Sequence, residues 1–380
     1  MIERFLTNQV REKLGRGKII VLYGPRRIGK TTMARQLLNE SSEGAGLYLN
    51  CDELAVQELL ESRNLKNMER SIGNATRIVI DEAQRVRNIG VSLKLLIDSR
   101  PDLDIIATGS SSFDLSNKIK EPLTGRSYEF ILEPLSLSEL QQHFHYSPLE
   151  LSSAYERLLR FGGYPSVILG NDQEATEEIS LITDRYLYKD TLELVELRQR
   201  QLLPRLLTAL ALQIGQEVSY HDLANNLGVK LETIERYITI LESAFVVYRL
   251  PALLPNKRNQ LSNRKRKVYF RDTGVRNALL DSFNPLSQRS DTEQLWENFC
   301  INERRKSLTK SNTPTKLQYW RGLYGEIDLI EQHRDESVNA IEFSWSNNKT
   351  VKPSKTFTQT YPEAKFTVIN RHNLADWLKL

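Results

Sequence analysis

The feature that most constrains the fold is a short apolar run that leads directly into a glycine-rich loop and then an amphipathic segment. Residues 18–23 (KIIVLY) are typical of a buried strand, and residues 31–39 carry apolar side chains at helical spacing. Between them, the segment from Gly24 to Thr31 fits the pattern G-x-x-x-x-G-K-[ST]. Between a strand and a helix, this pattern forms a cradle of backbone N–H groups that binds phosphate. The sequence therefore predicts a nucleotide site at the end of this strand.

The residue types in the loop suggest separate roles. Lys30 would bring a positive charge to the β- and γ-phosphates of ATP, and the Thr31 hydroxyl would coordinate Mg²⁺. Arg26 and Arg27 are further candidates for contact with phosphate or with a partner. The predicted nucleotide-binding residues are Gly24, Pro25, Arg26, Arg27, Ile28, Gly29, Lys30, Thr31 and Thr32.

A second apolar run, residues 78–80, ends in Asp81 and Glu82. Asp81 is placed to hold Mg²⁺ and its hydration shell, and Glu82 is placed to polarise an attacking water. A polar strand end that starts a helix is the alternative interpretation of these two carboxylates alone. Because both motifs occur in this order, the sequence predicts Mg²⁺-dependent ATP hydrolysis, with Lys30 and Glu82 in the catalytic set.

Three further residues are candidates for the same reaction. Thr108 and Ser110 follow the strand predicted at residues 104–107, and either hydroxyl could contact the γ-phosphate. A helix N-cap is the alternative role for such a residue. Arg126, just before the strand predicted at residues 127–132, is a candidate arginine finger for a neighbouring subunit. An ordinary surface arginine is the alternative.

The remaining segments predict more than one domain. At 380 residues, with 40% hydrophobic and 26% charged residues, the chain has enough apolar material for two or three globular cores. Strands that alternate with helices in the first part indicate a parallel sheet covered on both faces. The strands predicted there are residues 18–23, 46–49, 77–80, 104–107 and 127–132, and those predicted after residue 255 are 267–270, 316–320, 326–330, 340–343 and 365–369.

Between these two parts, residues 219–241 have the rhythm of a helix–turn–helix. Ser219 can cap a first helix, and Gly228 lies in the short turn before a second one. The second helix would enter a DNA groove in the functional interpretation. However, it carries Glu232 and Glu235, which would repel phosphate, so a packing module of three helices is an equal alternative.

A basic cluster follows. The net charge of +4 is too small to indicate nucleic-acid binding by itself, but residues 257–267 contain six basic residues and no acidic one. A solvated basic loop is the alternative. The predicted DNA-contacting residues are Lys257, Arg258, Arg264, Lys265, Arg266 and Lys267.

Taken in order, these motifs resemble the prokaryotic AAA+-type ATPases that carry a C-terminal domain of unknown function. The resemblance covers nearly the whole chain, and no single late motif is specific. It implies an AAA+ core at residues 1–148, a helical lid at 149–200, a winged-helix segment at 201–255 and a restriction-endonuclease-like α/β domain at 256–380. The motifs are GPRRIGKTT (24–32), VIDEAQ (79–84), TGSSS (108–112), LTGR (123–126), EPLSLSEL (133–140), GGYP (162–165), YLYKD (186–190), YFRDTG (269–274), ENF (297–299) and GEIDLI (325–330).

The resemblance also implies a possible metal site in the tail, formed by Glu297, Asp328 and Glu342. Restriction-type nucleases place a lysine two residues after the last carboxylate, where this chain has Ser344. A tail that docks nucleic acid or a partner without cutting is therefore the stronger expectation. The merely structural alternative, in which Asp328 and Glu342 are exposed strand residues, stays open.

The expected setting is the cytoplasm. The first residues lack a secretory apolar stretch, and the apolar run at residues 19–23 is far shorter than a membrane helix. Two cysteines, Cys51 and Cys300, form no CxxC pair. The expected partners are ATP, DNA, and either further copies of the chain or another protein, without a membrane. The alternatives to a DNA-acting ATPase are a nucleotide-gated interaction module with slow turnover and an ATP-regulated nuclease.

Overall fold

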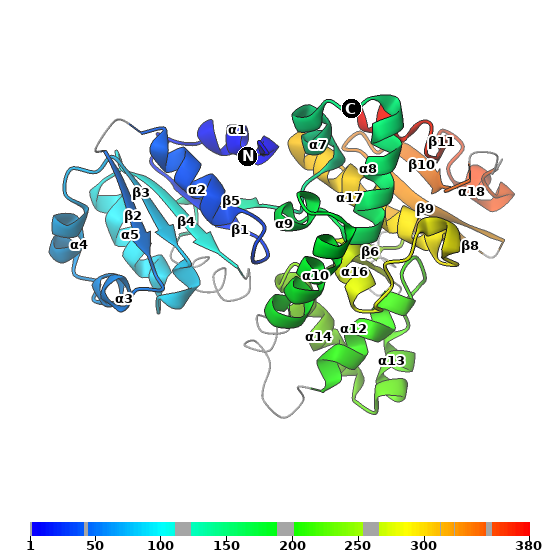
Figure 1. Cartoon of the computed structure of the whole chain (residues 1–380), viewed down its shortest axis with the longest axis horizontal. Helices are drawn as coiled ribbons and strands as arrows, with labels where there is room; N and C mark the ends of the chain where they lie inside the picture. Colours follow the sequence, from blue (N-terminus) through cyan, green and yellow to red (C-terminus); the bar gives the residue numbers. More distant parts are fainter. Residues whose placement is uncertain are drawn as a thin grey trace. The chain divides into compact units, whose positions relative to one another are not determined.

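The computed structural model (Figure 1) describes residues 2–41, 45–110, 123–187, 201–253, 266–311, 313–322, 324–346 and 352–380. The chain forms two compact units. The first comprises Met1–Glu133 with Ser243–Phe245, and the second comprises Pro134–Glu242 with Val246–Leu380. Within the described ranges, no helix combines the length and the apolar character needed to cross a membrane.

The first unit is built on a five-stranded parallel sheet with the strand order β2–β3–β4–β1–β5. The five strands predicted for this part are confirmed, each within two residues at either end. The elements of this unit are α1 (Phe5–Arg11), β1 (Ile19–Tyr23), α2 (Lys30–Asn39), β2 (Gly46–Asn50), α3 (Leu54–Glu61), α4 (Leu65–Ile72), β3 (Arg77–Asp81), η1 (Ala83–Arg85), α5 (Ile89–Ser99), β4 (Asp104–Gly109) and β5 (Ser127–Ile131).

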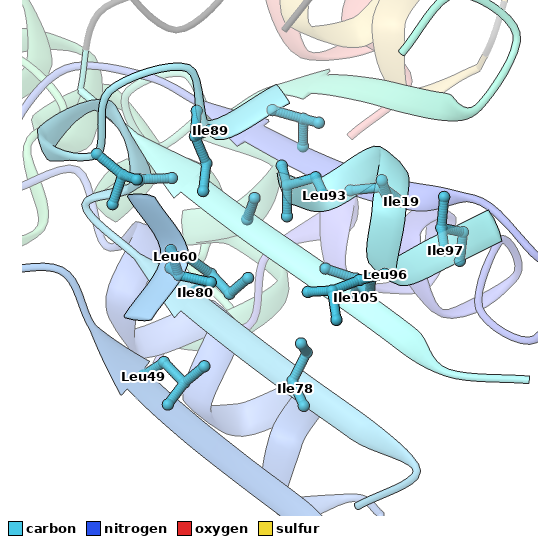
Figure 2. Close-up of a cluster of buried hydrophobic side chains, with 14 of the residues drawn as sticks. Ile19, Leu49, Leu60, Ile78, Ile80, Ile89, Leu93, Leu96, Ile97 and Ile105 are labelled. Carbon is cyan, nitrogen blue, oxygen red and sulfur yellow. The ribbon is translucent and has the colours of Figure 1, made fainter. Parts of the chain in front are cut away.

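Helices cover both faces of this sheet, which explains its continuous apolar strands. All five residues of β1 are buried. On one face, alternate strand residues such as Ile19, Ile80 and Ile105 pack with Leu93 and Leu96 of α5 (Figure 2). Helix α2 lies against β2, β3 and β4. Because the middle strands are buried on both faces, their sequences are continuous apolar runs and do not alternate between apolar and polar residues.

The second unit contains a helical part, a helix–turn–helix with a small sheet, and a larger α/β part. Its elements are α7 (Leu137–Phe144), α8 (Pro148–Phe161), α9 (Pro165–Ile168), α10 (Asp172–Leu181), the π-helical turn η2 (Ile182–Leu187), α12 (Leu202–Leu212), α13 (Tyr220–Leu227), α14 (Leu231–Ser243), β6 (Val247–Pro251), β7 (Arg266–Phe270), α16 (Thr273–Ala278), η4 (Leu286–Gln288), α17 (Thr292–Lys310), β8 (Lys316–Gly322), β9 (Gly325–Gln332), β10 (Val338–Phe343), α18 (Lys355–Thr360), β11 (Lys365–Ile369) and α19 (Leu374–Leu378).

The helix–turn–helix forms where the sequence predicts it. Ser219 caps α13 by accepting a hydrogen bond from the Asp222 backbone N–H at 3.2 Å. Gly228 ends that helix in the left-handed region with φ 69°, a conformation that glycine adopts at no steric cost. After α14, strands β6 and β7 pair antiparallel. The sequence predicts that the tail domain begins at residue 256. Strand β7 lies beyond that boundary, but it pairs with β6, which lies before it.

The α/β part of the tail has the element order helix, three strands, helix and strand. Its sheet runs β11–β10–β9–β8, with antiparallel pairing of β8 with β9 and of β9 with β10, and parallel pairing of β10 with β11. Helix α17 packs on β10, and α18 connects β10 to β11. This arrangement is the restriction-endonuclease-like fold that the resemblance implies.

Two of the quoted motifs, GGYP and YFRDTG, meet in a buried turn of the second unit. The Asp272 carboxylate accepts hydrogen bonds from the backbone N–H groups of Gly163, at 2.7 Å, and Val275, at 3.1 Å. Gly162 has φ 80°, and a Cβ there would lie 2.0 Å from an Asp272 oxygen. Burial raises the pKa of Asp272 above its ordinary value. These motifs therefore hold the helical part together rather than forming a reactive site.

Candidate functional site

The loop between β1 and α2 has the backbone that a phosphate cradle needs. Gly24 has φ 149°, and a Cβ at this position would lie 2.6 Å from the Leu132 carbonyl oxygen. Gly29 has φ 100° and is the N-cap of α2. Both positions require glycine, the first for close approach and the second for its left-handed backbone. The loop thereby delivers the N-terminus of α2, whose free N–H groups favour an anion.

Lys30 is folded over this loop rather than extended into solvent. It is only 5% exposed, and its Nζ donates hydrogen bonds to the carbonyl oxygens of Gly24 and Pro25, both at 2.8 Å. An ammonium group held by two backbone carbonyls has a defined position. The loop thus places one positive charge beside the start of α2.

Asp81, at the end of β3, gathers hydroxyl groups from three other elements. Its Oδ2 accepts hydrogen bonds from Thr31 Oγ1 at 2.9 Å and from the Tyr48 hydroxyl at 2.5 Å. Its Oδ1 accepts one from the Thr108 hydroxyl of β4. Because the strands are parallel, the C-terminal ends of β2, β3 and β4 lie at the same end of the sheet, beside the loop. Thr31 and Asp81, the two predicted metal ligands, are therefore in direct contact.

Asp81 contributes to the raised pKa values of two neighbouring side chains. Burial, and then the hydrogen bond to Asp81, raise the pKa of Tyr48 to about 12. Burial, and then the Asp81 charge, raise the pKa of Cys51 to about 12. The Arg35 guanidinium lies 4.3 Å from the centre of the Tyr48 ring. Both Tyr48 and Cys51 therefore stay neutral near pH 7.

Glu82 is held by the neighbouring residue Gln84. Glu82 has a left-handed backbone, φ 54° and ψ 40°, which is uncommon for a residue other than glycine. Its carboxylate accepts a hydrogen bond from Gln84 Nε2, and the same amide donates to Ser110 Oγ at 3.1 Å. The Glu82 backbone N–H donates to Thr108 Oγ1 at 3.2 Å. Gln84 thus connects the predicted water-polarising carboxylate to one of the two predicted hydroxyls.

The second unit holds a separate cluster of charges around Lys267 of β7. The Lys267 side chain is 0% exposed, and its Nζ forms ion pairs with Glu297 of α17 at 3.0 Å and with Glu326 of β9. Asp328, two residues further along β9, has an oxygen 3.9 Å from the same Nζ. The Tyr269 hydroxyl donates to the Glu297 carboxylate.

Burial and crowding shift the pKa values of this cluster. Burial, and then the Asp328 charge, raise the pKa of Glu297 to about 8 and that of Glu342 to about 9. Burial also raises the pKa of Asp328, which shares a hydrogen bond with Glu342. Burial alone would lower the pKa of Lys267, but the Glu297, Asp328 and Glu326 charges outweigh it and raise that pKa. Lys267 is therefore a permanent cation.

Comparison with protein families divides the chain into three matched segments. A model described as "AAA domain" matches residues 16–141. Two models described as domains of unknown function, DUF8612 and DUF4143, match residues 152–286 and 292–378. The first segment contains the whole loop and the Asp81 cluster.

Curated relatives match most of the chain. An uncharacterized protein of Mycobacterium tuberculosis is 30% identical over 328 residues, which are 84% of this chain and 69% of the relative. The chain belongs to the prokaryotic AAA-type family with C-terminal domains of unknown function. An uncharacterized protein of Methanocaldococcus jannaschii is 28% identical over 97% of this chain and 84% of its own length.

Among solved structures, a chain of Drosophila ORC bound to DNA is similar over 70% of this chain and 90% of its own. The sequence identity is 14% and the TM-score is 0.27. Membership of the family, together with the loop geometry, makes the first unit a nucleotide-binding AAA domain.

Within the AAA domain, the structure brings together most of the residues predicted from the sequence. Thr31, Asp81 and Thr108 form one hydrogen-bonded group, and Lys30 directly precedes Thr31 in the loop. Arg126 is not part of that group, because its Nε donates to Asp98 of α5 at 2.7 Å and both side chains are partly exposed. Glu82 and Ser110 are linked through Gln84.

The predicted DNA-contacting cluster needs one correction. The position of Lys267 in a basic run predicts a contact with DNA, but its buried ammonium pairs with carboxylates and presents no charge to a phosphate backbone. Arg266 is partly exposed. The other four predicted residues, Lys257, Arg258, Arg264 and Lys265, lie outside the residues that the structure describes.

The predicted tail metal site also differs from what the structure contains. Asp328 and Glu342 do share a hydrogen bond, but Glu297 faces Lys267 and Tyr269. Among the described residues, no group of three or more His, Cys, Asp or Glu side chains is arranged to hold a metal ion. At the position of the missing lysine, the buried Ser344 hydroxyl donates to the Ser346 carbonyl oxygen at 3.1 Å.

Three residues that contact the predicted site residues were not predicted from the sequence: Tyr48, Gln84 and Glu326. Gln84 has a local signal, since it follows Glu82 by two residues in the quoted VIDEAQ motif. Glu326 lies two residues before Asp328 on the same strand, so both share one face of the sheet. Tyr48 has no such signal, because only the strand order places it beside Asp81.

Proposed function

We propose that this AAA-type protein is a Mg²⁺-dependent ATPase that acts on or binds DNA. The observation that carries the proposal is the contact of Thr31 with Asp81, at 2.9 Å, directly beside the loop that positions Lys30. A hydroxyl and a carboxylate at the start of a phosphate cradle are the protein ligands that P-loop enzymes use for Mg²⁺.

The residues present fit both ATP and Mg²⁺. The loop glycines supply the backbone for a phosphate cradle, and the N-terminus of α2 favours its negative charge. Thr31 and Asp81 would hold Mg²⁺, which prefers oxygen ligands and keeps the remainder of its shell as water and phosphate oxygens. Bound Mg²⁺ would neutralise charge on the reacting phosphoryl oxygens.

The roles of the protein side chains follow from their placement. Lys30 binds and orients the β- and γ-phosphates with an ammonium group that the loop carbonyls already hold in position. Glu82 orients the attacking water and accepts its proton. Gln84 keeps the Glu82 carboxylate beside Ser110, which restricts its rotamer before the nucleotide binds.

The contacts favour Ser110 over Thr108 as the residue that senses the γ-phosphate. Thr108 is fully buried and its hydroxyl is occupied by Asp81 and by the Glu82 backbone. Ser110 lies at the end of β4 beside Gln84. An arginine-finger role for Arg126 would require its ion pair with Asp98 to open, which costs little for an exposed pair.

DNA binding is supported by the helix–turn–helix followed by the antiparallel pair β6–β7, which has the order of a winged helix. Lys230 and Arg236, in the turn before α14 and on α14 itself, are exposed and could contact phosphates. The test is steady-state ATP hydrolysis with Mg²⁺, with and without duplex and single-stranded DNA, at two salt concentrations.

We expect Mg²⁺-dependent turnover that DNA stimulates at low salt and that high salt returns to its basal rate. Chelating Mg²⁺ should abolish turnover under every condition. Turnover that is indifferent to DNA would contradict the DNA part alone. The complete absence of Mg²⁺-dependent turnover, with and without DNA, would contradict the ATPase assignment.

Gln84→Ala is expected to lower kcat by about 10- to 100-fold while nucleotide affinity stays unchanged, because a hydrogen bond to a charged group contributes roughly 1.5–3 kcal/mol. The reason is that Glu82 loses the amide that orients it. Steady-state kinetics together with a fluorescent-nucleotide titration would separate the two effects. Gln173→Ala is the matched control, since Gln173 donates to Glu177 at 3.0 Å in an exposed pair on α10. An equal loss in both variants, or a change in affinity alone, would contradict a positioning role for Gln84.

A second candidate is a nucleotide-gated module that binds a protein and turns over slowly. The observation that favours it is the acidic character of α14, where Glu232 is exposed and Glu235 partly so. The loss of Lys267 from the basic cluster favours it further. Basal turnover without any response to DNA in the experiment above would select this candidate.

A further inference from the structure

The ammonium group of Lys267 lies at a junction of three elements of the second unit. It comes from β7 and meets Glu297 of α17 and Glu326 of β9 directly, with Asp328 of β9 at 3.9 Å. A lysine is almost never fully buried unless it is paired, and this one has 0% exposure. Lys267 is therefore the buried cation that balances the charge of these carboxylates.

The carboxylates around Lys267 are fixed by bonds of their own. Glu297 accepts a hydrogen bond from the Tyr269 hydroxyl, and Asp328 accepts one from the Phe343 backbone N–H at 2.9 Å. The Tyr319 ring lies with its centre 5.5 Å from the Lys267 Nζ, a distance at which an ammonium group is attracted to the ring face. The acidic groups are thus held around the position that the ammonium fills.

The strand that would supply a lysine to this cluster supplies none. Two residues after Glu342 stands Ser344, which is fully buried and donates its hydroxyl to a backbone carbonyl. The positive charge comes instead from β7, a strand paired with β6 and not with the four-stranded sheet. The cation of the cluster therefore lies on a different sheet from Glu326 and Asp328.

We propose that the Lys267 ammonium takes the place of a metal ion in the tail, because it occupies the position that a divalent metal ion would need. Its ion pairs also hold the β6–β7 pair against the four-stranded sheet. The tail is then stable without metal, and it does not perform metal-dependent cleavage. This inference goes beyond nucleotide hydrolysis and is independent of it.

Neighbouring contacts support the fastening role. Glu217, which forms a backbone bridge with Lys267, accepts a hydrogen bond from the Tyr319 hydroxyl of β8 at 2.7 Å. Just after β6, the Leu253 backbone N–H donates to the Tyr319 carbonyl oxygen at 2.6 Å. The two sheets are therefore joined by backbone and side-chain contacts in addition to the buried ion pairs.

The test compares the full-length chain with Lys267→Met, both carrying Asp81→Asn so that the nucleotide site lacks its metal carboxylate. Methionine has nearly the length of lysine but no charge. In EDTA, Lys267→Met should lower the Tm by on the order of 10 °C, because removing one partner leaves buried carboxylates unpaired. Millimolar Mn²⁺ should restore part of that loss by binding the unpaired carboxylates. It should leave the Tm of the parent protein, which retains Lys267, unchanged.

Arg321→Met is the matched control. Arg321 also contacts Glu326, at 3.5 Å, and Glu217, at 3.7 Å, but its side chain is 47% exposed. We expect a small Tm change and no response to Mn²⁺. Electron paramagnetic resonance of Mn²⁺ should detect a bound ion in Lys267→Met and none at the tail of the Lys267 protein.

Two outcomes with folded proteins would overturn the proposal. One is a Mn²⁺ site in the Lys267 protein that Glu297→Gln removes, since a metal would then coexist with the ammonium. The other is a Lys267→Met protein as stable as its parent in EDTA. If Lys267→Met does not fold, Lys267→Met with Glu297→Gln should fold better because one unpaired acid is gone, and the failure of that rescue would also contradict the proposal.

Discussion

Replacing Lys30 with alanine should weaken ATP binding by about 10- to 100-fold, because hydrogen bonds to charged groups contribute roughly 1.5–3 kcal/mol and 1.4 kcal/mol is a factor of ten. Lys30 is 5% exposed and its ammonium is held by the Gly24 and Pro25 carbonyls, so the alanine variant removes a positive charge of fixed position from the loop. A titration with a fluorescent ATP analogue would measure the change.

The matched control is Lys66→Ala, which removes an exposed lysine from α4 of the same unit. It should bind ATP as the unmodified protein does. Thermal unfolding of both variants without nucleotide would show that neither has lost its fold. Tight ATP binding by folded Lys30→Ala would contradict the assignment of the loop from Gly24 to Thr32.

Glu82→Gln should lower turnover by about 10²- to 10⁴-fold, the usual contribution of a positioned general base, and leave ATP affinity unchanged. Glutamine retains the shape of the side chain and its ability to accept a hydrogen bond from Gln84, but it cannot take a proton from water. The left-handed backbone of Glu82 is also retained, since only the side-chain terminus changes. Steady-state hydrolysis and the same nucleotide titration would separate chemistry from binding.

Glu58→Gln, an exposed carboxylate on α3, is the control for this substitution. It should turn over ATP at the unmodified rate. If Glu82→Gln also did so, Glu82 would not be the residue that orients the water. If it lost affinity to the same degree as turnover, its role would be in binding rather than in the reaction.

The nucleotide site was largely predictable because its signals are local. The glycines, Lys30 and Thr31 occur within eight residues, and their backbone requirements are met inside one strand–loop–helix unit. Asp81 and Glu82 follow an apolar strand, so their place at a sheet edge also comes from local pattern. The helix–turn–helix was predictable for the same reason, through Ser219 and Gly228.

The environment of these residues was not predictable, because it depends on strand order. Tyr48 reaches Asp81 only because β2 pairs with β3, and nothing in the sequence around Tyr48 specifies that neighbour. The choice between Thr108 and Ser110 likewise depends on which hydroxyl faces Asp81 and which faces Gln84.

Lys267 is the clearest case of this difference. Its neighbours in sequence are basic, and from sequence it belongs to a charged surface loop, whereas its neighbours in space are Glu297, Glu326 and Asp328. Strand periodicity and turn residues specify local conformation, so the sequence determined the AAA core, its phosphate loop and the order of the elements. Burial and charge pairing join residues distant in the chain, so only the packed structure decided that this lysine is an internal cation rather than a contact for DNA.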